Sequence, residues 1–146
     1  MSEHRATVEW QRSGEFRYET YSRSHRLMFD HNLTIQGSAA PGNIPPSAAG
    51  APGVDPEQAF VAALSSCHML WFLDVACRAG WVVERYVDEA VGILDKTWIS
   101  RVTLRPEVTF SGKTPTQEEH RGLHEKAHEK CFIANSVKTE VVVEPC

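Results

Sequence analysis

The 146-residue sequence lacks several patterns that would assign it to a class. Its 15 Lys and Arg residues are outnumbered by 19 Asp and Glu residues, and the formal net charge is -4. It therefore has no basic stripe of the kind that binds nucleic acid, and no polybasic patch for a membrane surface. The first ten residues lack the apolar segment of a signal peptide, so we expect a cytoplasmic protein. No Cys-x-x-Cys pair or other zinc-ribbon spacing is present among the four cysteines.

In a cytoplasm structural disulfides are rare, so these cysteines are expected to be reduced thiols or a catalytic dithiol. The sequence is also short enough for one domain, and we expect residues 1–146 to form a single domain with its own core.

What the sequence does contain is a long apolar segment over residues 55–80. Asp55 supplies a side-chain acceptor for a helix start, Pro56 suits the first turn, and Gly80 is a typical stop. Apolar residues occur on every side of this segment, whereas a surface helix keeps them on one stripe. We therefore expect a helix that is buried on most of its circumference. Small polar residues inside it argue against a membrane span.

Alternating apolar and polar residues predict strands on both sides of this helix. Residues 5–37 predict about three antiparallel strands, with Arg23 on one of them. Residues 38–54 are rich in proline, glycine and small side chains, and predict a loop. Residues 81–112 predict two or more further strands, paired as a hairpin around Lys96 and Thr97.

A second helix is expected over residues 116–131, with acidic residues in its first turn and lysines near its end. A last strand is expected within residues 137–145. The order β-β-β-α-β-β-α-β predicts an α+β fold in which antiparallel sheets pack around two helices.

The four cysteines occupy different positions. Cys67 lies in the middle of the first predicted helix, where a free cysteine is either a small buried apolar residue or a nucleophile. Cys77 lies about 15 Å further along that helix, beyond the roughly 7 Å that a disulfide allows between Cα atoms. Cys131 ends the second helix, where the dipole disfavours a thiolate, and so suits a resolving thiol better than an attacking one. Cys146 is terminal and has no evident role.

Histidines form a second candidate group. His120, His124 and His128 recur every four residues, and His-x3-His is a zinc-ligand spacing. The neighbouring residues are charged, so the alternative is a solvated polar face of the helix. His68 follows Cys67 directly but points about 100° away on an ideal helix, and we interpret it as a core histidine. A zinc protein stays open as an alternative.

Two separated motifs carry a resemblance to a known family. Residues 55–67, DPEQAFVAALSSC, and residues 128–141, HEKCFIANSVKTEV, resemble the paired signature of the OsmC-like family. That family includes osmotically inducible protein C and organic hydroperoxide reductase. The segments Ser-Cys-His at 66–68 and YSRSH at 21–25 resemble a less characterised branch of it.

The resemblance implies a cysteine-based peroxidase that reduces organic hydroperoxides. Cys67 matches the attacking cysteine, Cys131 the resolving cysteine, Glu57 the family's glutamate and Arg23 its arginine, with Arg26 as a second candidate. The reaction would pass through a Cys67 sulfenic acid and a Cys67–Cys131 disulfide, which an external dithiol reduces without a bound cofactor. Arg23 would stabilise the thiolate and Glu57 would orient Arg23.

The spacing of these residues implies a second chain. Glu57 and Cys67 lie about 15 Å apart along a straight helix, so we expect an intertwined homodimer in which the partner chain supplies Glu57, with Arg23 a candidate for the same origin. A pocket lined by Phe60, Leu64, Trp71 and Phe132 would favour alkyl hydroperoxides. The alternative function is a module of the same fold that binds a lipid-like ligand or senses redox state without catalysis.

Overall fold

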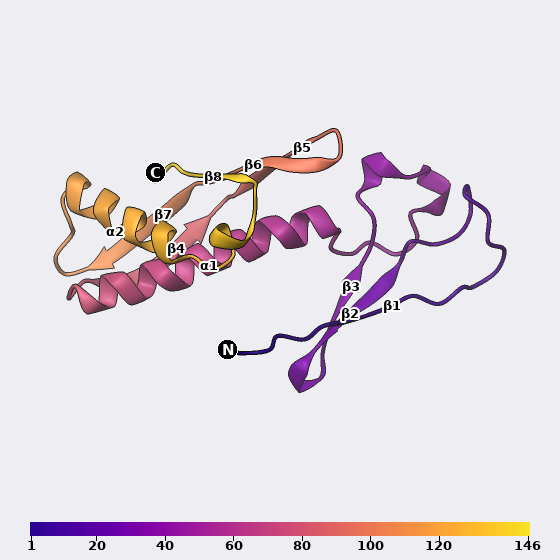
Figure 1. The fold of residues 1–146 in the computed structure, drawn as a ribbon, viewed down its shortest axis with the longest axis horizontal. Helices are drawn as coiled ribbons and strands as arrows, with labels where there is room; N and C mark the ends of the chain where they lie inside the picture. Colours follow the sequence, from indigo (N-terminus) through magenta and orange to yellow (C-terminus); the bar gives the residue numbers. More distant parts are fainter. The chain divides into compact units, whose positions relative to one another are not determined.

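A three-stranded antiparallel sheet forms the first part of the chain (Figure 1). Its strands are β1 (Thr7–Glu9), β2 (His25–Phe29) and β3 (Leu33–Gly37), in the order β1-β2-β3. The computed structural model describes residues 1–146, which divide into an N-terminal unit, residues 1–59, and a C-terminal unit, residues 60–146. The three strands expected in residues 5–37 are confirmed.

Arg23 lies outside this sheet, so its expected place on a strand is wrong. The chain ahead of it turns, with the N–H of Tyr21 donating to the carbonyl oxygen of Arg17 at 2.9 Å. His25 Nδ1 then donates to the carbonyl oxygen of Arg23 at 2.7 Å. A side chain that binds a nearby backbone group in this way competes with strand pairing, and β2 accordingly begins at His25.

The loop expected at residues 38–54 is present and contains two short 3-10 turns, η2 (Pro41–Asn43) and η3 (Pro46–Ala48). Its end is attached to β3, because the N–H of Val54 donates to the carbonyl oxygen of Gln36 at 2.9 Å. The loop therefore leads from the sheet edge into the first helix.

The first helix, α1 (Pro56–Arg78), begins and ends as expected. Asp55 Oδ1 accepts a hydrogen bond from the N–H of Gln58 at 2.8 Å, which caps the first turn. Gly80 follows the helix with a φ of 87°, the left-handed conformation that glycine adopts without strain.

Burial of α1 differs from the expectation. Within one chain its buried residues lie along one stripe, and Leu70 on another side is 63% exposed. The buried residues are Leu64, His68, Phe72, Val75 and Ala76. By length and composition the helix could cross a membrane, a test that core helices of globular proteins also pass.

Four strands lie between the helices, two more than the expected order contains. Strands β4 (Val82–Asp88) and β7 (Pro106–Ser111) form an antiparallel pair. Strands β5 (Val91–Asp95) and β6 (Trp98–Leu104) form the expected hairpin around Lys96 and Thr97. The last strand, β8 (Glu140–Val143), pairs in parallel with β6, so the expectation of purely antiparallel sheets is wrong at this strand.

The second helix, α2 (Gln117–Lys130), has a complete capping box. Thr116 Oγ1 accepts from the N–H of Glu119 at 3.2 Å, and Glu119 Oε2 accepts from the N–H of Thr116 at 2.8 Å. Cys131 is the residue that ends the helix. The expected helix over residues 116–131 is confirmed.

Two apolar clusters hold α1 in the C-terminal unit. One contains Phe72 of α1 and Leu123 and Ala127 of α2, and Tyr86 and Phe110 of the β4–β7 pair pack against it. The other joins Leu64 of α1 to β6 through Val102 and Leu104. Each fully buried Leu or Phe side chain contributes about 1.5–3 kcal/mol. The helix turns between Leu64 and Phe72, which carry Cys67, are therefore fixed at both ends.

Candidate active site

Cys67 and Cys131 come together in the C-terminal unit, one from the middle of α1 and the other from the end of α2. Cys131 is 1% exposed, whereas Cys67 is half-buried. The N–H of Ala134 donates to Cys131 Sγ at 3.4 Å, which fixes the sulfur over the turn that follows α2. All four cysteines of the chain are free thiols.

The two thiols differ in their electrostatic environment. Burial raises the pKa of Cys131 to about 11, and a hydrogen bond and charge from the Cys67 side chain raise it too, while the backbone N–H groups of Ala134 and Ile133 lower it. Cys131 therefore keeps its proton at neutral pH. The pair thus consists of a half-exposed thiol beside a buried and protonated one, an arrangement that suits an attacking and a resolving cysteine.

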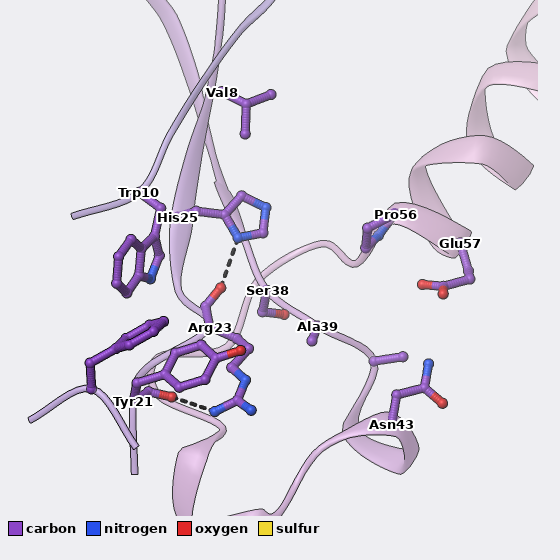
Figure 2. A pocket seen from close by; sticks show the side chains of 12 residues that line it. Val8, Trp10, Tyr21, Arg23, His25, Ser38, Ala39, Asn43, Pro56 and Glu57 are labelled. Atoms are coloured by element: carbon purple, nitrogen blue, oxygen red, sulfur yellow. Dashed lines mark hydrogen bonds between the residues drawn. The ribbon is translucent and has the colours of Figure 1, made fainter. Parts of the chain in front are cut away.

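Arg23 and Glu57 line a cavity of about 490 Å³ in the N-terminal unit (Figure 2). Aromatic rings form one wall, with ring centroids 5.7 Å apart for Trp10 and Phe16 and 4.7 Å apart for Phe16 and Tyr21. This wall is apolar, so the cavity suits an organic group with a polar end.

Arg23 is the cation of this cavity. Its guanidinium carbon lies 3.4 Å from the centroid of the Tyr21 ring, and its Nη1 donates to the carbonyl oxygens of Tyr18 at 2.9 Å and Tyr21 at 2.7 Å. The other candidate, Arg26, forms an exposed ion pair with Glu9 and lies outside the cavity. The arrangement therefore favours Arg23 over Arg26 as the site arginine.

Glu57 is held in the first turn of α1, and its Oε2 is buried without a hydrogen-bond partner. Within one chain Glu57 and Arg23 form no ion pair, and Nη1 of Arg23 donates to backbone carbonyls. A buried carboxylate oxygen without a partner costs stability. An unpaired buried polar atom at a cavity wall is therefore a candidate functional group.

A chain of buried histidines joins the helices in the C-terminal unit. His68 Nε2 lies 2.9 Å from His124 Nδ1, and His124 Nε2 lies 3.1 Å from His120 Nε2. The ring of Phe72 stacks on His124, with centroids 4.3 Å apart. A neutral imidazole has one donor and one acceptor nitrogen, so His124 donates to one neighbour and accepts from the other.

Burial keeps these histidines neutral. It lowers the pKa of His68 to about 4, with the charge of His128 adding to this and that of Asp88 opposing it. It lowers the pKa of His124 to about 3, aided by the charges of His68 and His120. The interpretation of His68 as a core histidine fits this position, although its Nδ1 lacks a partner.

The alternative of a solvated histidine face is wrong at His124, which is only 2% exposed. Its two nitrogens point to two different histidines, as in a hydrogen-bonded chain. No group of three or more His, Cys, Asp or Glu side chains in the structure could hold a metal ion.

The four residues expected to line a pocket for alkyl hydroperoxides differ in their surroundings. Leu64 is fully buried in the cluster around β6, with Phe60 packed against it, and Trp71 packs edge-on against Phe132 with centroids 5.3 Å apart. The cavity of about 490 Å³ lies in the N-terminal unit, and Trp10 and His25 line it although the sequence analysis assigned them to no site. The signals for them were their places within the segment predicted to form strands and, for His25, its place in the YSRSH segment.

Comparisons with known proteins agree with this architecture. The model of the family described as OsmC-like protein matches residues 48–145. An OsmC-like protein of unknown function from Vibrio cholerae is 49% identical, with a TM-score of 0.94 over 100% of both chains. No curated protein matches the sequence.

Two more distant structures share the fold. The organic hydroperoxide resistance protein OhrB of Bacillus subtilis is 19% identical, with a TM-score of 0.69 over 99% of this chain and 98% of that chain. An organic hydroperoxide resistance protein OsmC from Legionella pneumophila is 17% identical, with a TM-score of 0.69 over 99% of this chain and 95% of that chain. The α+β fold expected from the sequence is confirmed, and the chain belongs to the OsmC-like family.

Proposed function

We propose that this protein is a cysteine-based peroxidase that reduces organic hydroperoxides. The observation that carries the proposal is the asymmetric thiol pair, with half-buried Cys67 beside fully buried Cys131. The names of the Bacillus and Legionella proteins, which describe organic hydroperoxide resistance, support the same activity.

The proposed reaction starts with the Cys67 thiolate attacking the terminal oxygen of the hydroperoxide. The S–O bond forms, the O–O bond breaks, and the alkyl oxygen leaves with the electron pair and takes up a proton to become the alcohol. Cys67 is oxidised to a sulfenic acid. Cys131 then attacks the Cys67 sulfur, water leaves, and a Cys67–Cys131 disulfide forms, which an external dithiol reduces.

Cys131 is suited to the second step because its raised pKa keeps it a thiol while Cys67 reacts. The only electrophile placed to meet it is then the sulfenic acid beside it. Its backbone contact with Ala134 holds the sulfur in position, so the condensation needs little rearrangement.

Arg23 and Glu57 are the proposed polar groups that face the peroxide. A guanidinium stays charged in an apolar cavity, stabilises a thiolate and binds peroxide oxygens. The aromatic wall of the same cavity favours an organic peroxide over hydrogen peroxide. We propose that the site is completed in a homodimer, with Glu57 of one chain acting beside Cys67 of the other.

Stopped-flow oxidation by cumene hydroperoxide, followed by mass spectrometry without reductant, tests the proposal. One equivalent should link Cys67 to Cys131 with the loss of two hydrogen atoms. Cys131→Ser should stop at a sulfenic acid that dimedone traps, and Cys67→Ser should not react. The exposed residues supply matched controls, because Cys77→Ser and Cys146→Ser should behave as the wild type. Oxidation of Cys67 no faster than that of free cysteine would rule the activity out.

The cavity also favours a second candidate, a module that binds an apolar ligand without turnover. Its volume of about 490 Å³ and its aromatic wall would accommodate such a molecule. One titration with the hydroperoxide and its alcohol distinguishes the two functions. A ligand-binding module would bind both molecules equally well and leave all thiols reduced.

A further inference from the structure

The guanidinium of Arg23 is held in place at the aromatic wall of the N-terminal cavity. Its carbon lies 3.4 Å from the centroid of the Tyr21 ring, and its Nη1 donates to the carbonyl oxygens of Tyr18 at 2.9 Å and Tyr21 at 2.7 Å. Nη1 carries two of the N–H groups of a guanidinium, so both are used within the protein. The stacked ring and the two carbonyls together fix the plane of the group.

The opposite edge of this guanidinium is open to a ligand. Its Nε and Nη2 form no hydrogen bond with the protein. In Figure 2 this edge faces the side of the cavity on which Asn43 lies. Nε and Nη2 present two parallel N–H groups, the fork that matches the two oxygens of a carboxylate. Arg23 is half-buried, so such a pair would be screened less than one on the surface.

Three rings beside Arg23 offer aromatic faces and edges. The Phe16 and Tyr21 rings are inclined by 36°, and the Trp10 ring stands edge-on to Tyr21 at 85°. The Trp10 indole N–H donates to the carbonyl oxygen of Ser22 at 2.8 Å, so the polar atom of this ring is satisfied. A flat aromatic group can stack on one of these rings and meet the edge of another, as aromatic pairs prefer. The cavity volume of about 490 Å³ is in the range of sites for small organic molecules.

The negative charge of the cavity lies on its other side. Glu57, at the start of α1, is separated from the aromatic rings across the cavity (Figure 2). An anionic group would be repelled by Glu57 and attracted by Arg23. The charges therefore orient an anion towards the wall that also carries the rings.

We propose that this cavity binds an aromatic carboxylate, with its two oxygens on Nε and Nη2 of Arg23 and its ring against Trp10, Phe16 and Tyr21. Every residue of the site belongs to the N-terminal unit. The inference therefore goes beyond the proposed function and does not require Cys67. Because the proposed function also uses Arg23, the anion would compete with the peroxide for it.

Isothermal titration calorimetry of the reduced wild-type protein with 2-naphthoate tests the proposal. 2-Naphthamide has the same rings without the charge and should bind about 10-fold more weakly, the effect of losing a hydrogen bond to a charged group. Decahydro-2-naphthoate keeps the carboxylate without the aromatic rings and should bind about 2–10-fold more weakly. Equal affinity for the amide and the anion, or no saturable binding of 2-naphthoate, would overturn the proposal without any variant.

Arg23→Lys separates the fork from the charge. It keeps a cation but loses the paired N–H groups, and should weaken 2-naphthoate binding by about 10-fold. Arg26→Lys is the matched control, because Arg26 lies outside the cavity in an exposed ion pair with Glu9, and it should bind as the wild type. A folded Arg23→Lys variant with wild-type affinity would refute the role of the fork.

Glu57→Gln distinguishes a simple anion from a zwitterion. With the repulsive charge removed, 2-naphthoate should bind at least as tightly as it does to the wild type. 3-(2-Naphthyl)alanine, which adds an ammonium group, should bind more weakly than 2-naphthoate. If it instead binds more tightly and loses that advantage in Glu57→Gln, the site is one for aromatic amino acids and the proposal is wrong.

Nitrogen–proton NMR locates the binding site. 2-Naphthoate should shift the indole N–H signal of Trp10, assigned with Trp10→Phe, while the indole signals of the C-terminal unit, from Trp71, Trp81 and Trp98, stay in place. A Trp10 signal that does not respond would refute this site. No peroxide takes part in these titrations, so a protein that binds the anion but never oxidises Cys67 would refute the peroxidase alone.

Discussion

His68 Nε2 and His124 Nδ1 lie 2.9 Å apart in the core between α1 and α2, where neither ring is more than 2% exposed. The folded state holds both rings neutral, because burial lowers the pKa of His68 to about 4 and that of His124 to about 3. In the unfolded chain both titrate near an ordinary value of about 6.5.

Acid should therefore destabilise the fold. Below pH 6.5 the unfolded chain binds more protons than the folded one, so the free energy of unfolding is highest above that pH and falls towards the folded pKa values. Over this range the free energy of unfolding falls by on the order of 1.4 kcal/mol per pH unit for each histidine. Urea titrations at pH 7, 6 and 5 measure it, and a His68→Leu, His124→Leu double variant should lose most of the slope. An unchanged slope in that variant would place the acid sensitivity elsewhere.

Arg23 and Arg26 should differ sharply in their effect on the reaction. Arg23 lines the cavity, whereas Arg26 forms an exposed ion pair with Glu9. We expect Arg23→Ala to slow oxidation of Cys67 by about 100-fold or more, as the loss of one preorganised electrostatic group does in other enzymes. Arg26→Ala should change the rate less than twofold in the same stopped-flow assay. The reverse ranking would assign the role to Arg26.

Gly37→Ala should damage the cavity, because the new Cβ would meet three atoms of the His25 ring at 2.3–2.9 Å. Moving the ring breaks its hydrogen bond to Arg23, and such overpacking costs about 1–3 kcal/mol. Gly122→Ala is the matched control: it lies inside α2 with no atom near the new Cβ, and should stabilise the helix by roughly 1 kcal/mol. Thermal unfolding of both variants checks this: the melting temperature should fall for Gly37→Ala and rise for Gly122→Ala.

A shared site across a homodimer predicts complementation between inactive variants. Cys67→Ser and Glu57→Ala each remove a different part of the site. After unfolding and refolding together, half of the dimers are mixed and carry one intact site of two, so about a quarter of wild-type activity should return. Refolding without any recovery, or a protein that sediments as a monomer while active, would contradict the shared site.

Local signals in the sequence were sufficient to predict the two helices. The cap of α1 depends on Asp55 and Gln58, three residues apart, and the capping box of α2 on Thr116 and Glu119. Both contacts are made within one turn, so the residue types alone predict them. The same holds for the β5–β6 hairpin, whose turn is formed by adjacent residues.

Features that depend on distant residues could not be predicted from the sequence. Asp88, at the end of β4, accepts hydrogen bonds from Ser65 on α1 at 2.5 Å and from the N–H of Arg105 at 2.6 Å. The parallel pairing of β8 with β6 joins residues 39 positions apart, such as Arg101 and Glu140. The cavity wall likewise assembles from the first sheet, the loop and the start of α1.

The buried position of Cys131 has a consequence for chemical labelling. A thiol with a pKa of about 11 reacts slowly with iodoacetamide or glutathione disulfide at neutral pH, because less than about one part in a thousand is thiolate. Desolvation thus shields this sulfur from the small electrophiles of the cell, yet leaves it in contact with Cys67. In the proposed reaction, Cys131 therefore meets a single electrophile, the oxidised sulfur of Cys67.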